Sequence, residues 1–284
     1  MLRRGIVVLV VVFGLGMALS GNCRAQVIQG SLVVTDVTPV QFCVVWAASE
    51  PASGWVHVFL DPEGSIPCLE AVVKSESAEH PPAEDIGVMK VSVVGLEPDK
   101  EYFFQTETTL KKDNAVYLSP IRSVRTEKRS DIVRNDVLVQ EVTIGETEPA
   151  PGMLVVASVD QASYPVSGWV ADGVPAQYAA IDTNNFYDKD THENLELQGG
   201  ETVYLMVVGG ALGAAETQET IPDETGGMQK LSRAVSVSAS GSRTAVAVKK
   251  DSEGTVVSAS GGGCFISTVR GNEECQSPNV KFTP

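Results

Sequence analysis

The feature that most constrains this fold is a run of alternating apolar and polar residues within 33–108, anchored by Trp46 and Tyr102. From Val40 to Trp46 every second residue is apolar, which is the period of a β-strand with one face in a hydrophobic core. A Glu-Pro-Ala-Ser-Gly turn follows, and Trp55–Phe59 then alternates in the same way. The sequence therefore predicts an antiparallel β-structure with Trp46 in its core.

A second local pattern surrounds Tyr102. Leu96 is followed by Pro98 two residues on and by Tyr102 six residues on. This spacing is typical of a tyrosine corner, in which the ring packs in the core while its hydroxyl binds backbone groups at the turn. We expect Trp46, Leu96, Pro98 and Tyr102 to be structural residues of one domain.

Three pieces of this region together resemble a fibronectin type III domain. They are Thr-Asp-Val-Thr-Pro at 35–39, the core tryptophan Trp46, and the Gly-Leu-x-Pro-x-x-x-Tyr run that ends at Tyr102. The resemblance covers roughly residues 28–127, and we assign the domain to 26–127. It implies a Greek-key sandwich of seven strands. The family shares no catalytic residues, so the resemblance implies no chemistry.

The first 25 residues are typical of a signal peptide. Arg3 and Arg4 precede the apolar run Ile6–Leu19, and Ala25 supplies the small residue expected at a cleavage site. The apolar run is shorter than the roughly 20 residues that a membrane-spanning helix needs. An uncleaved membrane anchor is the alternative. We expect an exported protein, located outside the cell, on its surface or in the periplasm.

The charge of the chain excludes one class of partner. The chain has 21 basic and 36 acidic residues, a net charge of −15, and the signal segment removes three arginines but no acidic residue. Such a polyanion repels nucleic acids and anionic lipids. We expect a protein or glycan partner at the cell surface. A membrane contact is expected only through an uncleaved anchor or a modified tail.

Four cysteines follow the signal segment: Cys43, Cys68, Cys264 and Cys275. In an oxidising compartment an even number predicts disulfides, and proximity along the chain favours Cys43–Cys68 and Cys264–Cys275 among the three pairings. Cys43 lies off the Trp46 face of its strand and is expected to point away from the core. The alternative is that the cysteines are unpaired small hydrophobic residues.

Two irregular segments interrupt the first half of the chain. Residues 69–86 are charged and contain consecutive prolines, which excludes a central strand and predicts a loop between edge strands. Residues 125–131 are charged and are interpreted as a linker between domains.

Alternating strands return in residues 128–250, which we interpret as a second β-sandwich without sustained helical periodicity. No internal repeat of the first domain is expected, because Trp169 lacks the strand context of Trp46 and no Leu-x-Pro-x-x-x-Tyr run returns. Residues 251–284 are interpreted as a Ser/Gly-rich linker and a tail with two cysteines. The Gly-Gly-Gly-Cys-Phe-Ile run at 261–266 resembles a box found near the C-termini of exported bacterial proteins, but only a polar tail follows it here.

One cluster of oxygen-bearing side chains could bind a metal ion. Its members alternate along the chain as calcium ligands do: Asp182, Asn184, Asp188 and Asp190. The run lacks the glycine of an EF-hand loop, so the alternative is an Asx-rich turn whose side chains bind their own backbone. Nearby aromatic residues could form a sugar- or peptide-binding surface or could belong to the core: Trp169, Tyr178, Phe186 and Tyr187.

The sequence contains no Gly-x-Ser-x-Gly elbow, no His-Glu-x-x-His and no phosphate-binding glycine loop. We therefore expect an all-β, non-catalytic interaction or structural module with no catalytic residues and no cofactor other than calcium. The alternative is a catalytic or accessory subunit that acts on a carbohydrate or phosphoester, with its site in the second domain.

Overall fold

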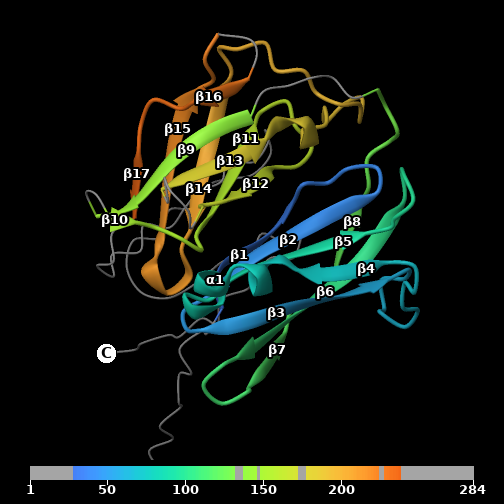
Figure 1. The fold of residues 1–284 in the computed structure, drawn as a ribbon. Helices are drawn as coiled ribbons and strands as arrows, with labels where there is room; N and C mark the ends of the chain where they lie inside the picture. Colours follow the sequence, from blue (N-terminus) through green and yellow to red (C-terminus); the bar gives the residue numbers. More distant parts are fainter. Residues whose placement is uncertain (1–27, 132–136, 146–147, 172–176, 224–226, 238–284) are drawn as a thin grey trace, which may run out of the picture.

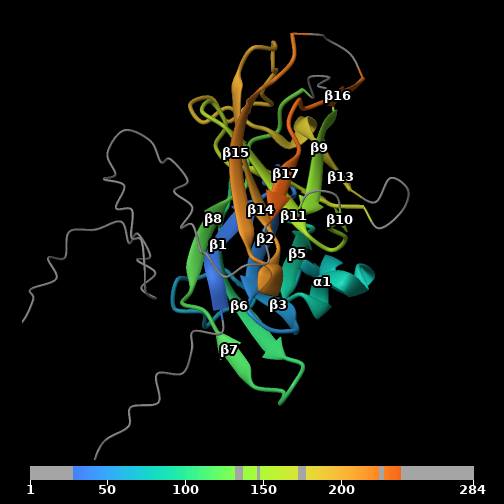
Figure 2. The same cartoon turned by 90° about the vertical axis from the view of Figure 1, so that its left-hand side faces the viewer.

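The computed structural model describes residues 28–131, 137–145, 148–171, 177–223 and 227–237. This part of the chain is mostly β, with several antiparallel sheets and one short α-helix. Figures 1 and 2 show two pairs of sheets in a row, with the N-terminal half of the chain below and the C-terminal half above. The predicted all-β class is confirmed for the described residues.

The N-terminal sheet pair is built from eight strands: β1 (Ile28–Thr35), β2 (Gln41–Ala48), β3 (Ala52–Phe59), β4 (Val72–Ser75), β5 (Val88–Val94), β6 (Glu101–Leu110), β7 (Val116–Leu118) and β8 (Arg122–Arg125). One sheet has the order β1-β2-β5-β4, and in the other β6 lies between β3 and both β7 and β8. Between β4 and β5 lie a 3₁₀-helix, η1 (Glu76–Glu79), and the short helix α1 (Pro81–Asp85).

The C-terminal sheet pair is built from nine strands: β9 (Val137–Ile144), β10 (Glu148–Pro149), β11 (Leu154–Val159), β12 (Val166–Trp169), β13 (Tyr178–Asp182), β14 (Thr202–Val208), β15 (Ala214–Thr220), β16 (Met228–Lys230) and β17 (Val235–Val237). One sheet has the order β12-β11-β14-β15. In the other, β9 pairs antiparallel with β10 and β13 and parallel with β16 and β17. Two further 3₁₀-helices are η2 (Thr183–Asn185) and η3 (Gly210–Leu212).

Each sheet pair encloses its own hydrophobic core. In the N-terminal core, Trp46 is 2 % exposed, and its indole N–H donates to the hydroxyl of Thr108 on the opposite sheet at 2.8 Å. Burial of the largest side chain therefore leaves no unpaired indole donor, which would cost stability in an apolar interior.

Tyr102 occupies the position that the sequence predicts for it. Its ring is 2 % exposed, and its hydroxyl accepts a hydrogen bond from the backbone N–H of Glu97 at 2.8 Å. Leu96 is buried beside it, and Pro98 is half-buried in the turn. The hydroxyl thus satisfies a backbone donor at the turn that precedes β6, as expected of a tyrosine corner.

Several local expectations need correction. Val40 was expected in the core but is 43 % exposed, because β2 begins at Gln41 and Val40 lies in the bend before it. Residues 69–86 are not only a loop, since the segment forms β4, η1 and α1, with proline tolerated in the first turn of α1. Trp169 does lie in a strand, at the end of β12.

Candidate functional site

The outer face of the β1-β2-β5-β4 sheet is covered by the C-terminal sheet pair. Cys43 lies opposite Ser92, and Val45 lies opposite Lys90 in the pairing of β2 with β5, so these four residues share one face. The core residues of β2, which alternate with Cys43 and Val45, point to the other face. All the residues of β2 after Gln41 are buried, which shows that both faces of this strand are covered.

Part of this junction is apolar. A small cluster joins Val45 and Val88 of the sheet and Ala83 of α1 to Leu154 and Val156 of β11. Removing this apolar surface from water favours contact between the two sheet pairs.

The backbones also meet closely at one point of the junction. The N–H of Ala211 donates to the carbonyl of Ile86 at 2.7 Å. The neighbouring Gly210 has φ of 55°, and a Cβ there would lie 1.9 Å from the same carbonyl oxygen. Only glycine fits at this position, both for its backbone conformation and for the space available.

A charged cluster lies beside the apolar contact. The ammonium of Lys90 is 3.4 Å from a carboxylate oxygen of Asp36 and 3.3 Å from one of Glu76. The side chains of Lys90 and Asp36 are 9 % and 6 % exposed. Burial alone would lower the pKa of Lys90, but the two carboxylates more than offset it, so the pKa is raised and the lysine stays charged.

The same carboxylates bind the C-terminal half directly. Asp36 accepts hydrogen bonds from the backbone N–H of Ser167 at 3.1 Å and from its hydroxyl at 2.5 Å. Glu76 accepts a longer bond, 3.3 Å, from the indole N–H of Trp169, whose ring lies 4.6 Å from that of His80. Both acids therefore join Lys90 to strand β12. A buried charge with such partners avoids most of the penalty of an unpaired one.

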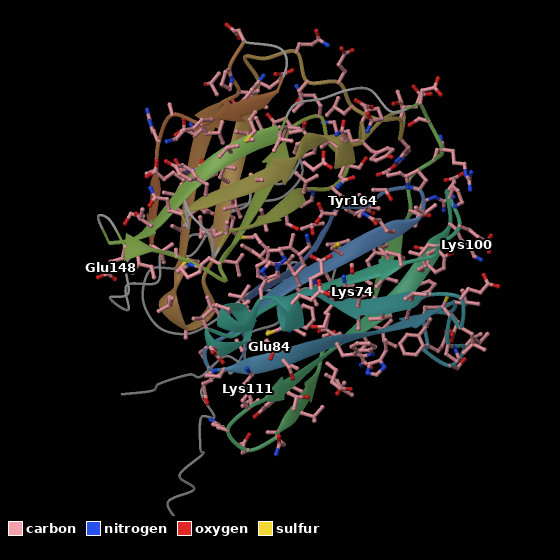
Figure 3. The ribbon with its side chains drawn as sticks, viewed as in Figure 1. Lys74, Glu84, Lys100, Lys111, Glu148 and Tyr164 are labelled. Atoms are coloured by element: carbon pink, nitrogen blue, oxygen red, sulfur yellow. The ribbon has the colours of Figure 1, made fainter. Side chains whose placement is uncertain are left out.

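A hollow of about 430 Å³ opens at this cluster. It is lined mainly by polar residues of both halves of the chain: Asp36, Gln41, Cys43, Lys74, Glu76, Lys90, Ser92, Val94, Ser167, Ala180, Asp182 and Asn185. Lys74 of β4, one of these lining residues, is labelled in Figure 3. Cys43 is 3 % exposed, and burial, followed by the nearby Asp36 carboxylate, raises the pKa of its thiol.

The chemistry available in the hollow is limited. A lysine with a raised pKa is a poor general base, and a thiol with a raised pKa is a poor nucleophile, because only the thiolate attacks. The groups that enzymes commonly activate are here held protonated. The cluster links the two sheet pairs through buried ion pairs and hydrogen bonds.

A second polar contact closes the other end of the junction. The side chain of Glu127 is 1 % exposed, and its carboxylate lies 2.8 Å from the imidazole Nδ1 of His192. Burial raises the pKa of Glu127, and the hydrogen bonds from His192 and Ser163 only partly oppose it. Tyr164, labelled between the two halves in Figure 3, packs against the N-terminal core. The predicted charged linker 125–131 is thus partly buried.

The predicted calcium ligands form local turns. Asp182 accepts from the backbone and side-chain nitrogens of Asn184 at 3.0 and 2.8 Å, and caps η2. Asp188 accepts from the backbone nitrogens of Asp190 and Thr191, which lowers its pKa. These bonds are those of the Asx-turn alternative. Within the described ranges no group of three or more His, Cys, Asp or Glu side chains is placed to hold a metal ion. Calcium binding stays a prediction.

The predicted Cys43–Cys68 disulfide is wrong. Both thiols are free, because Cys43 lies on the outer face of β2, whereas Cys68 packs against the N-terminal core. The two side chains therefore lie on opposite sides of the β1-β2-β5-β4 sheet. The outward direction predicted for Cys43 is confirmed. Cys264 and Cys275, like the signal segment and the glycine-rich box, lie outside the described residues.

The four aromatic residues near the predicted calcium loop do not form one surface. Phe186 and Tyr187 are buried, at 0 % and 6 % exposed. Trp169 is half-buried at the junction, while Tyr178 bonds to Lys230 and Glu141 on β16 and β9. For Phe186 and Tyr187, the alternative that these aromatic residues belong to the core is therefore correct.

The sequence patterns did not predict the junction cluster. Lys90 is the one charged residue in the apolar strand Val88–Val94, and a lone lysine in such a run is a signal for a buried pair. Asp36 belongs to the Thr-Asp-Val-Thr-Pro run that carries the resemblance to fibronectin type III domains, and its positive φ of 53° is a backbone conformation that few non-glycine residues adopt.

Comparisons with known proteins add no family. No protein-family model matches the chain, and a search of curated proteins finds no match. In the part of the chain that the structure describes, no helix is long and apolar enough to cross a membrane.

Proposed function

We propose that this chain is an exported, non-catalytic module in which two β-sandwiches form one rigid unit and present their open surfaces to a protein or glycan at the cell surface. The signal segment of residues 1–25 supports export. The buried contacts of Asp36 with Ser167 and of Glu127 with His192 support rigidity, because each half supplies partners that the other needs.

The observation that carries the proposal is the buried ion-pair cluster at the junction, in which the ammonium of Lys90 lies 3.4 Å from Asp36 and 3.3 Å from Glu76. Lys90 is held charged between Asp36 and Glu76, and the Cys43 thiol is held neutral by burial. Both shifts run opposite to those of a catalytic lysine or cysteine. The buried ion pairs and hydrogen bonds of this hollow therefore favour a contact that holds the two halves together over a catalytic site.

The finer fold is also a proposal. The order β1-β2-β5-β4 opposite β3-β6-β7, together with the bond between Tyr102 and Glu97, supports an immunoglobulin-like Greek key, to which fibronectin type III domains are related. Modules of this kind serve as spacers and binding units in many exported proteins, and function still depends on the surface that each presents.

The test is a hydrolysis screen of the full chain against glycosides and phosphoesters, combined with small-angle scattering. We expect no turnover and a scattering curve that fits one fixed arrangement of the two halves. Turnover that disappears when single carboxylates of residues 128–250 are replaced would establish the enzyme alternative instead. A curve that requires many arrangements would contradict the rigid unit.

A further inference from the structure

The outer face of the β3-β6-β7 sheet lies on the far side of the molecule from the C-terminal sheet pair, as both views show (Figures 1 and 2). The alternation of β6 buries Phe104, Thr106 and Thr108 and places Gln105, Glu107 and Thr109 on the outer face. This face is therefore open to a partner, whereas the opposite sheet is covered.

The strand register sets apolar side chains on both sides of a polar column. Glu107 of β6 lies directly opposite Trp55 of β3 on one side and Leu118 of β7 on the other. Two pairs further along, and therefore on the same face, Thr109 lies opposite Val116 of β7. Trp55, Leu118 and Val116 are 42 %, 56 % and 55 % exposed. Directly opposed residues lie within about 5.5 Å, so the three columns form one continuous surface.

The polar groups of the column are held in place. The imidazole Nε2 of His57 lies 2.9 Å from a carboxylate oxygen of Glu107, and the amide of Gln105 donates to the carbonyl of Ser119 at 2.7 Å. Groups fixed by such bonds lose little freedom when a ligand binds. The column thus offers oriented hydrogen-bonding atoms beside an exposed indole.

We propose that this face binds a neutral polysaccharide, an inference that rests on the proposed function and names its partner. A sugar ring has an apolar face of C–H groups and hydroxyls around its rim. The indole of Trp55 provides a flat apolar surface for the C–H face of the sugar. The column of Gln105, Glu107 and Thr109 provides hydrogen-bond acceptors and donors for the sugar hydroxyls.

Charge favours a neutral ligand over other occupants. With a net charge of −15, the chain repels acidic polymers and also repels a second copy of itself. The polar column through the middle of the face is unsuited to the apolar centre of a protein interface, where charged residues are depleted. A neutral glycan is not repelled by the net charge, and it can form hydrogen bonds with the polar column.

The test is affinity electrophoresis of the full chain in native gels that contain hydroxyethylcellulose, xylan, galactomannan or dextran. We expect at least one polysaccharide to slow migration, and Trp55→Ala to weaken that binding on the order of tenfold or more, as truncation of an aromatic hot spot does. Leu69→Ala is the control, because Leu69 is 90 % exposed in the turn between β3 and β4 and belongs to none of the three columns. The Leu69→Ala variant should bind the polysaccharide as strongly as the parent protein does.

Two outcomes would overturn the inference while leaving the proposed function intact. One is free migration in every gel by a chain that also shows no turnover. The other is a Trp55→Ala variant slowed as much as the parent, which would place the binding elsewhere. If the parent is a dimer that Trp55→Ala converts to a monomer, and no gel slows it, the face is a self-association surface and the inference is wrong. Hydrolysis of the retarding polysaccharide would instead overturn the non-catalytic proposal.

Discussion

The two sheets of the N-terminal pair differ in what covers their outer faces. In the β1-β2-β5-β4 sheet, Cys43, Val45 and Lys90 on the outer face are at most 7 % exposed, because the C-terminal half covers them. In the β3-β6-β7 sheet the outer residues Trp55 and Leu118 remain more than 40 % exposed. The outer face of the first sheet is buried within the molecule, and the outer face of the second is exposed to solvent. Substitutions on the buried face should therefore lower the free energy of unfolding much more than substitutions on the exposed face.

The largest contrast is expected between two tryptophans. Trp46→Ala should lower the free energy of unfolding by about 4 kcal/mol, because it opens a cavity in the core and leaves Thr108 without its indole donor. Trp55→Ala, on the open face, should change it by at most about 0.5 kcal/mol. Urea denaturation followed by circular dichroism measures both. Equal losses would mean that the two sheets do not differ in this way.

Removal of Lys90 should come next. Lys90→Ala leaves Asp36 and Glu76 buried without their cation, and breaking a buried ion pair costs about 3 kcal/mol. Lys74→Ala is the control, because the pair of Lys74 with Glu79 is more than half exposed and such pairs contribute at most about 1 kcal/mol. Thermal melting should separate the two variants clearly. A Lys90→Ala protein as stable as Lys74→Ala would contradict a buried junction.

Two valines allow a comparison of identical chemistry. Val45→Ala at the junction should cost about 2 kcal/mol, since its side chain is 1 % exposed. Val116→Ala on β7, 55 % exposed, should be within about 0.5 kcal/mol of the parent. The change in unfolding free energy of each variant is obtained from its denaturation midpoint, with one denaturant m-value used for all the proteins. A neutral Val45→Ala would mean that the C-terminal half does not cover this face.

The smallest effect concerns pH and the contact of Glu127 with His192. Since burial raises the pKa of Glu127 in the folded state, folding favours its protonated form. Its contribution to stability is therefore complete below the ordinary pKa of a glutamate and is lost as the pH rises through the raised value. Glu127→Gln removes this dependence.

The measurement is the difference in unfolding free energy between Glu127→Gln and the parent from pH 4 to pH 7. The difference should move in favour of the variant as the pH rises. A difference that stays constant would contradict the raised pKa of Glu127. Comparing differences cancels the titration of the other acidic residues, which both proteins share.

Sequence patterns predicted those parts of the fold that depend on neighbours along the chain. The alternation of β3, the burial of Trp46 and the corner at Tyr102 follow from residues less than ten positions apart, and the structure has all three. Alternation did not predict that the outer face of β2 is also covered, because nothing local distinguishes a solvent-facing Val45 from one that another sheet covers.

The junction was beyond local patterns for a physical reason. Asp36 and Ser167 are 131 positions apart, and their hydrogen bond depends on how the two halves dock. The same docking explains why Cys43 is buried without a disulfide: the C-terminal half covers the face on which a partner cysteine was expected. The lone Lys90 in an apolar strand was the one local sign of this contact.

The most direct test of the central claim, that the C-terminal half covers the β1-β2-β5-β4 sheet, is the alkylation rate of each cysteine in the native chain, resolved by peptide mass spectrometry. Cys43 is 3 % exposed with a raised pKa, whereas Cys68 is only partly buried. We predict that Cys68 is alkylated while Cys43 stays protected until the protein unfolds. Alkylation of Cys43 as fast as Cys68 under native conditions, or recovery of the two as a disulfide, would contradict the covered sheet.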